Sequence, residues 1–342
     1  GNIPWISSSD LFDNDIRTIS INRHITNDAI LNSSAKLCPK STICIVSRVG
    51  VGKVAVSKCE ICTSQDFMNI IEYDGNKYFL AQLIQIIIKS TQLQGTSIKG
   101  ITSKEINNFK LQIPTISEQD KIMQFLELIE DRIQTQSKII DDYLYLKESI
   151  IQHIFNNNYH SVPLNDLIKE SSLRNKNLSF NNILSVNNSL GFIKQTEQFE
   201  ERKVASTNTS NYKIVKKNQY AYNPARINVG SIARLKNFDI GIVSPMYIIF
   251  ELNTTRITYT YFDIFLQSTT FKKQLLKKLE GSVRQCLTFS GMQNMSIELP
   301  SIDVQIQLSK KIKNIDLKIL IEKKYLEQLR NQKKYLLRNM FI

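Results

Sequence analysis

The chain has 342 residues, of which 42% are hydrophobic and 22% are charged, a composition typical of a globular protein with about two domains. Lysine and arginine outnumber aspartate and glutamate by 44 to 31, and the resulting net charge of +13 favours a polyanionic partner, with nucleic acid as the first candidate. The longest apolar stretch, residues 78–88, is too short to cross a membrane. Residues 1–10 lack a signal-peptide pattern and the five cysteines are an odd number, so we expect a cytoplasmic protein without disulfides.

Residues 1–115 are predicted to form a first mixed α/β domain. Two short β-branched runs, Thr42–Val46 and Val54–Val56, predict strands, and residues 77–90 predict a helix that closes the domain. Basic residues near the turns are candidate contacts to DNA phosphates and base edges, namely Arg48, Lys53 and Lys58. For each of them, a solvated surface charge is the alternative interpretation.

Residues 116–158 carry a seven-residue apolar repeat that predicts a coiled-coil helix. One row of the repeat consists of Ile122, Ile129, Gln136, Tyr143 and Ile150, and the other consists of Leu126, Ile133, Ile140, Lys147 and Ile154. Two polar side chains, Gln136 and Lys147, interrupt these rows. Over residues 118–155 eight acidic residues face only four basic ones, so the helix is acidic.

Residues 159–300 are predicted to form a second mixed α/β domain. Strands are expected at Tyr220–Tyr222 and Tyr247–Phe250, and one closing helix is expected over residues 258–280. The candidate DNA contacts in this domain are again basic residues near turns, namely Lys213, Lys216, Lys217, Arg226, Arg234 and Lys236. A solvated surface position is the alternative for each of these side chains as well.

Residues 301–342 predict a second coiled-coil helix, with ten basic and four acidic residues over 303–342. Its opposite charge favours pairing with the first helix. In an antiparallel pair, the two residue numbers in each layer add to a constant. A constant of 469 matches every polar interruption, because it faces Lys147 with Glu322 and Gln136 with Lys333. The alternative is that the lysines extend their charged ends to solvent and fix no register.

The two halves of the chain are similar to each other. Residues 95–155 align without a gap to residues 281–341, at an offset of 186. Gly95 and Gly281 fall on each other in this alignment, and we interpret both as helix C-caps that use a positive φ angle. Lys99 and Arg284 follow in the paired loops and are further candidate DNA contacts. The repeat predicts a pseudo-two-fold arrangement of two domains and two helices.

No active site is visible in the sequence. Gly50–Lys53 lacks the spacing and the hydroxyl residue of an ATP-binding loop, and residues 223–226 match only the beginning of an amino-methyltransferase motif. Cys59 and Cys62 have the spacing of a zinc-binding pair, but Cys38 and Cys44 do not complete a second one. We therefore expect buried free thiols and no metal site.

Several segments resemble the specificity subunits of Type I restriction-modification systems. The resemblance rests on residues 111–119 (Leu-Gln-Ile-Pro-Thr-Ile-Ser-Glu-Gln) followed by a heptad helix, and on residues 3–8, 223–233 and 241–247, and it spans nearly the whole chain. It implies an α+β protein in which two target-recognition domains are separated by two long helices forming an antiparallel coiled coil. Because the first copy begins almost directly at Ile3, we expect N-terminal sequence to be missing from the first recognition domain.

The resemblance also implies a function and a set of partners. Such a chain is a non-catalytic subunit that reads a bipartite site on double-stranded DNA, with one half-site for each recognition domain. It holds no cofactor itself, because two methyltransferase subunits bring S-adenosylmethionine and restriction subunits, where present, use ATP and Mg²⁺. The main alternative is a coiled-coil assembly adaptor without sequence-specific DNA binding, and a methyltransferase fragment is a further one.

Overall fold

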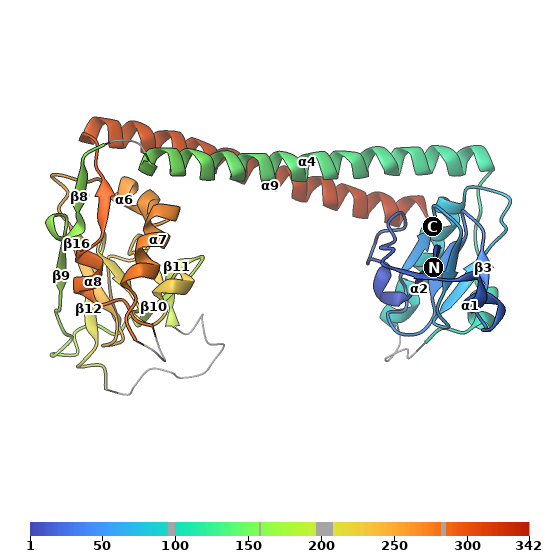
Figure 1. The fold of residues 1–342 in the computed structure, drawn as a ribbon, viewed down its shortest axis with the longest axis horizontal. Coiled ribbons are helices and arrows are strands. Elements are labelled where there is room, and N and C mark those ends of the chain that lie inside the picture. The colour runs from blue at the N-terminus through green and yellow to red at the C-terminus, as the bar shows by residue number, and fades with distance from the viewer. Residues whose placement is uncertain (95–99, 157–158, 196–207, 282–284, 342) are drawn as a thin grey trace. The chain divides into compact units, whose positions relative to one another are not determined.

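Figure 1 shows the chain in a computed structural model, which describes all residues except 95–99, 157–158, 196–207, 282–284 and 342. Two compact units are present. Unit 1 consists of Gly1–Ser137 with Lys324–Ile342, and unit 2 consists of Lys138–Lys323. The division falls inside the two long helices, α4 (Ile116–Asn156) and α9 (Ile302–Met340), so each unit contains a part of both helices.

Unit 1 combines short strands with helices. Its strands are β1 (Ile3–Ile6), β2 (Arg23–Ile25), β3 (Leu37–Cys38), β4 (Ile43–Val46), β5 (Val54–Val56), β6 (Ile61–Thr63) and β7 (Phe67–Ile70). Its helices, besides the parts of α4 and α9, are α1 (Asn27–Leu31), α2 (Lys77–Gln94), α3 (Ser103–Asn107) and the 3-10 turn η1 (Ser8–Asp10). The strands form a four-stranded sheet in the order β2-β1-β6-β3 and a three-stranded antiparallel sheet in the order β5-β4-β7.

The three-stranded sheet of unit 1 is buried on both faces. Along β4, the side chains of Ile43 and Ile45 enter one core with α2, the start of α4 and the end of α9, where Phe341 stacks on Phe79. Cys44 and Val46 point the other way, into a second core that contains Ile6 of the four-stranded sheet. Because successive strand residues point to opposite faces, the continuous apolar run of β4 reflects this double burial.

Unit 2 has more and shorter sheets. Its strands are β8 (Ser161–Pro163), β9 (Ile168–Ser171), β10 (Leu184–Asn187), β11 (Gly191–Lys194), β12 (Lys213–Lys216), β13 (Tyr220–Tyr222), β14 (Ile232–Arg234), β15 (Ile240–Val243), β16 (Ile248–Leu252) and β17 (Ser296–Glu298). Its shorter helices are α6 (Tyr259–Phe265), α7 (Thr269–Lys278) and α8 (Phe289–Gln293), with the 3-10 turns η2 (Leu164–Asp166) and η3 (Ile227–Val229). The largest sheet is antiparallel, in the order β14-β13-β16-β9.

The main sheet of unit 2 also separates two cores. Tyr220 and Phe250 stack with ring centroids 5.2 Å apart and pack against α6 and α7, which lie on one side of this sheet in Figure 1. The end of α4 enters the same core through Phe155. Ala221 and Ile249, the alternate residues of the same strands, enter a separate core beneath the β10–β11 hairpin. Packing between aromatic side chains therefore holds α6, α7 and the end of α4 against the main sheet.

Buried glutamines secure the first turns of both long helices. Gln119 is 1% exposed, and its amide nitrogen donates to the Pro114 carbonyl at 2.9 Å while its carbonyl accepts from the Asn76 backbone at 3.0 Å. Gln305 is fully buried and makes the same pair of contacts, donating to the Pro300 carbonyl at 2.9 Å and accepting from the Thr258 backbone at 2.8 Å. These residues, 186 positions apart in the sequence, attach each helix to the fold that precedes it.

The long helices run antiparallel, as predicted, but in a different register. In unit 2, Lys147 forms an ion pair with Asp316 at 2.7 Å, and Glu322 pairs with Lys318 on its own helix at 2.7 Å. In unit 1, Lys333 pairs with Glu130 instead of Gln136. Both interhelical pairs have residue numbers that add to 463 instead of 469, so these contacts correct the predicted register by nearly one heptad. The lysines reach carboxylates at the edge of the seam, which satisfies their charge better than a polar core layer does.

Other predicted elements compare closely with the structure. Residues 43–46, 54–56, 220–222 and 248–252 are strands, and α2 extends the predicted helix by four residues to Gln94. The prediction of one helix over residues 258–280 is wrong, because the chain forms two helices, α6 and α7, separated at Ser268. The Ser268 hydroxyl donates to the Phe265 carbonyl at 2.7 Å, after the end of α6, and accepts from the Phe271 backbone at 3.0 Å, which caps the start of α7. None of the described helices is long and apolar enough to cross a membrane.

Of the two glycines predicted to cap helices, Gly281 and Gly95, the structure describes only Gly281. Gly281 has the expected positive φ of 106°, but it lies past the end of α7, next to the isolated bridge between Glu280 and Cys286. It therefore allows a turn and does not cap the helix. Gly95 lies outside the described residues, as do Lys99 and Arg284.

Candidate functional site

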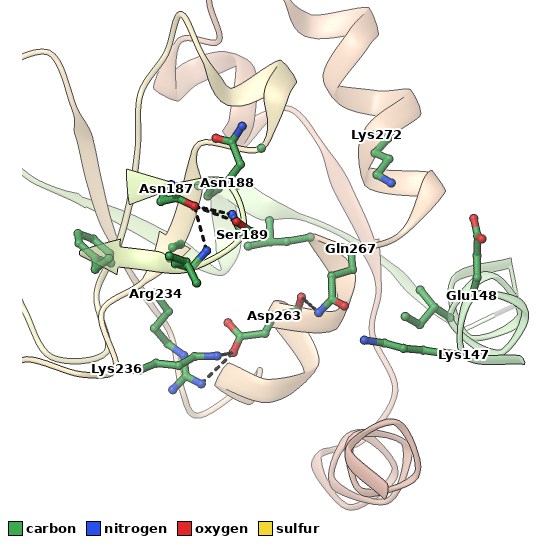
Figure 2. A pocket seen from close by; sticks show the side chains of 18 of the residues that line it. Lys147, Glu148, Asn187, Asn188, Ser189, Arg234, Lys236, Asp263, Gln267 and Lys272 are labelled. Atoms are coloured by element: carbon green, nitrogen blue, oxygen red, sulfur yellow. Dashed lines mark hydrogen bonds and ion pairs between the residues drawn. The ribbon is translucent and has the colours of Figure 1, made fainter. Parts of the chain in front are cut away.

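Unit 2 has a pocket of about 690 Å³, shown in Figure 2. Four segments border it: the end of α4, the β10–β11 hairpin, the stretch from Gly230 to Asn237, and the helices α6 and α7. Its charged and amide side chains are Lys147, Glu148, Gln152, Asn187, Asn188, Arg234, Lys236, Asn237, Asp263, Gln267 and Lys272. The four cations exceed the two carboxylates, so the pocket is suited to a negatively charged, hydrogen-bonding ligand.

Asp263 is the centre of a network in the wall of this pocket. It accepts from Arg234 at 2.8 Å, from Lys236 at 2.9 Å and, through its other oxygen, from the Tyr220 hydroxyl at 2.7 Å. The Arg234 guanidinium also lies over the ring of Tyr259, 5.0 Å from its centroid. Burial, together with the nearby Asp263 carboxylate, raises the pKa of Tyr220 well above its ordinary value, so this hydroxyl stays a donor. Arg234 and Lys236 thus contribute to the fold of unit 2.

The β10–β11 hairpin forms another wall of the pocket. Leu184–Asn187 pairs with Gly191–Lys194, and the side chain of Asn187 folds into the turn between them. Its oxygen accepts from the backbone of Ser189 at 2.9 Å and from the backbone of Leu190 at 3.1 Å. This Asx turn orders the hairpin tip, while Asn188, Ser189 and Leu190 remain exposed.

Of the remaining basic candidates of unit 2, Lys213 and Lys217 have partners within the unit. Lys213 is half-buried and donates to the Tyr247 carbonyl at 2.7 Å, and burial lowers its pKa. Lys217 pairs with Asp239 at 2.8 Å on the surface. Lys216 and Arg226 are exposed. The structure therefore leaves Lys216 and Arg226 as the candidates most accessible to a ligand.

Unit 1 places its three predicted basic residues around neighbouring turns. Arg48 and Lys58 are exposed beside the ends of β4 and β5. Lys53 is half-buried and donates to the Ser8 carbonyl at 3.4 Å. Gly50 and Gly52, with φ angles of 86° and 95°, form the turn before Lys53. This glycine-rich segment therefore allows the chain to turn between the antiparallel strands β4 and β5.

Sequence reasoning missed the acidic and amide members of the pocket. Asp263 lies on α6 and Gln267 lies in the turn that follows it; neither belongs to a recognisable motif, and only folding brings them opposite Arg234. The hairpin tip had a readable signal, because Asn187-Asn188-Ser189 separates two short apolar runs in the manner of a β-turn. A search for basic residues alone therefore did not identify the acidic and amide residues of this pocket.

The cysteines lie apart from the pocket. Cys44 is fully buried in β4, and burial, with a smaller contribution from Cys38, raises the pKa of its thiol to about 12. Cys59 is half-buried and Cys62 lies in β6. Among the described residues, no group of three or more His, Cys, Asp or Glu side chains is arranged to hold a metal ion.

Comparisons with known proteins point in one direction. Residues 1–142 match the family model described as Type I restriction modification DNA specificity domain. The chain is 35% identical over 147 residues to the Type I restriction enzyme MjaIX specificity subunit of Methanocaldococcus jannaschii, and 33% identical over 138 residues to the EcoR124I/EcoR124II specificity subunit of Escherichia coli. These matches cover 40% and 37% of the chain and about one third of the length of each relative.

Similar solved structures extend over nearly the whole chain. One match is a chain from a structural study of complex assembly and conformational transition of the type I R-M system. Its TM-score is 0.65 at 13% identity, and the match covers 98% of this chain and 90% of that one. The HsdS subunit from Thermoanaerobacter tengcongensis matches with a TM-score of 0.56 and 14% identity, over 99% and 90%. At these identities the likeness concerns the fold, and it includes both mixed α/β parts and both long helices.

Proposed function

We propose that this chain, whose residues 1–142 match the Type I specificity domain, reads a bipartite site on double-stranded DNA, with one half-site for each unit. The observation that carries the proposal is the specificity-domain match, combined with a fold likeness that extends over both units. The net charge of +13 agrees with a DNA ligand, because lysine and arginine neutralise phosphates.

We further propose that the long helices bind methyltransferase subunits. In unit 2, both long helices expose large apolar side chains: Leu144, Tyr145 and Leu146 on α4, and Leu317, Leu320 and Ile321 on α9. Tyr145 is 75% exposed and Ile321 is 57% exposed. Exposed apolar surface of this kind marks a protein interface, and helices of a partner are its natural occupants.

The division of labour follows from this assembly. The chain supplies recognition, and the methyltransferase subunits supply S-adenosylmethionine and the methyl-transfer chemistry to adenine. Restriction subunits, where present, add ATP- and Mg²⁺-dependent activity. The assembly works in the cytoplasm, where a reducing environment keeps the five free cysteines reduced.

The decisive experiment compares methylated DNA in cells that contain or lack this chain, with the methyltransferase subunits present in both. We expect one bipartite adenine motif to be methylated only when the chain is present. The purified chain should also form a stable complex with the methyltransferase subunits. An unchanged methylome together with a stable complex would support the assembly-adaptor alternative and contradict the recognition role.

A further inference from the structure

We propose that the tip of the β10–β11 hairpin and the turn at Arg226–Val229 form the surface with which unit 2 reads bases in the DNA major groove. We call this surface the reading edge, and its members are Asn188, Ser189, Leu190, Arg226, Asn228 and Val229. The inference rests on the proposed function, since it assigns the contacts for one half-site. It goes further by separating base-reading side chains from the basic residues that maintain the fold.

The two parts of the reading edge lie against each other. Gly230, which follows the turn, is so close to Asn188 that a Cβ atom added at Gly230 would lie 3.6 Å from the Asn188 Cβ. The next residue, Ser231, donates from its hydroxyl to the Val186 carbonyl at 3.3 Å, which attaches the turn to β10. Segments about 40 positions apart in sequence thus form one continuous surface.

Both loops hold their shape through internal contacts. The Asn187 side chain closes the hairpin tip, as described above. In the turn, the Arg226 carbonyl accepts from the backbones of Val229 at 3.2 Å and Ser231 at 3.1 Å. Gly230 has a φ of 93°, a conformation that favours glycine at this position. A rigid surface loses little conformational entropy when it binds, which suits recognition of a defined sequence.

The reading edge exposes apolar side chains that the interior does not use. Leu190 is 68% exposed and Val229 is 52% exposed. Met246, which is 59% exposed, lies beside the same turn, because the side-chain nitrogen of Asn223 is 3.5 Å from its sulfur. Apolar groups gathered at the tips of ordered loops indicate a contact surface.

The chemistry of this edge matches the major groove. The groove admits a two-stranded β-ribbon, and β10–β11 is such a ribbon. Arginine pairs with two acceptors of guanine, asparagine pairs with the acceptor and donor of adenine, and apolar side chains contact the thymine methyl group. Arg226, Asn228 and Leu190 provide one group of each kind.

Arg226 differs from the basic residues nearby. Arg234 and Lys236 are held by Asp263, and Lys213 is held by the Tyr247 carbonyl. Within the part of the chain that the structure describes, the exposed Arg226 side chain has no hydrogen-bond or ion-pair partner. Its guanidinium is therefore available for a ligand without the loss of an internal contact.

The test uses the full chain with its methyltransferase subunits and determines the methylated motif for Arg226→Lys, Arg226→Ala and Asn228→Ala. Lys169→Ala is the matched control, because β9 lies at the opposite edge of the main sheet from β14. We expect the reading-edge variants to relax discrimination at bases of one half-site by roughly ten- to hundred-fold, and the control to keep the motif. Arg226→Lys keeps the charge but loses the bidentate geometry, so it should relax the motif as well.

Each other outcome has a separate meaning. A uniform loss of methylation at an unchanged motif would identify Arg226 as a phosphate contact and overturn the inference. Changes in both half-sites, or an unchanged motif with full methylation, would overturn it too. If removal of the whole chain left the methylome unchanged, the proposed function itself would fail. Thermal melting of each variant shows that the fold is retained.

Discussion

Two arginines with similar sequence surroundings have different environments in unit 2. Arg226 and Arg234 both directly follow an alanine, and both were predicted to contact DNA. Arg234 lies over the Tyr259 ring and pairs with Asp263, and its side chain is 14% exposed. Arg226 points into solvent at the start of η3. The difference depends on Asp263, which is nearly 30 residues further along the chain.

Removal of the Asp263 carboxylate should destabilise unit 2. Asp263→Ala leaves Arg234 buried without its partner and removes an acceptor from Tyr220, so we expect a loss of about 3 kcal/mol in the free energy of unfolding. Denaturant titration followed by circular dichroism measures this loss. Asp239→Ala, which breaks the exposed pair with Lys217, is the control and should leave stability unchanged. Equal stability of both variants would contradict a structural role for Asp263.

The pairing of α4 and α9 shows what a heptad pattern leaves open. Sliding one helix by seven residues keeps apolar rows opposite each other, so the pattern indicates the seam but not its register. We predicted the register from the polar interruptions alone. The structure instead pairs Lys147 and Lys333 with flanking carboxylates, and Ile129 and Ile133 pack with Leu329 in unit 1. Neighbouring positions outside the rows therefore decided the alignment.

A double-mutant cycle distinguishes the two registers. Leu329 is 4% exposed and packs in the same cluster as Ile133, so Leu329→Ala should cost about 3 kcal/mol. Combined with Ile133→Ala, it should show a coupling energy of about 1 kcal/mol in urea unfolding. The register first predicted faces Leu329 with Ile140. A coupling found in the Leu329–Ile140 cycle and absent from the Leu329–Ile133 cycle would restore that register.

At the scale of the whole molecule, each long helix belongs to both units. Its 41 or 39 residues correspond to about 60 Å of continuous α-helix. At one end, buried contacts join α4 to the core of unit 1 through Met123 and Leu126, and at the other end Ile154 and Phe155 enter the core of unit 2. Under the proposed function, the length of these two helices would set the unread spacer of the bipartite DNA target.

Removing one heptad from the middle of each helix tests this spacer role. The deletion shortens each helix by about 10 Å, the rise of seven residues, which corresponds to about three base pairs of DNA. We expect the methylated motif to keep both half-sites and to lose about three base pairs of spacer. Methylome sequencing of cells with the shortened chain measures this. Altered half-sites at the original spacing would contradict the spacer role. Deletion from α4 alone mismatches the pair and serves as a folding control.

The sequence by itself determined the mixed α/β class of the two domains, the two long helices and their pairing, while the antiparallel direction of that pair came from the family resemblance. It also indicated strands such as Thr42–Val46, because local periodicity and opposite charge are properties of neighbouring residues and of composition. Only the tertiary structure decided the helix register and the separation of Arg226 from Arg234. Each of these depends on a side chain that folding brings from elsewhere in the chain, such as Asp316 or Asp263, and no local pattern records such a partner.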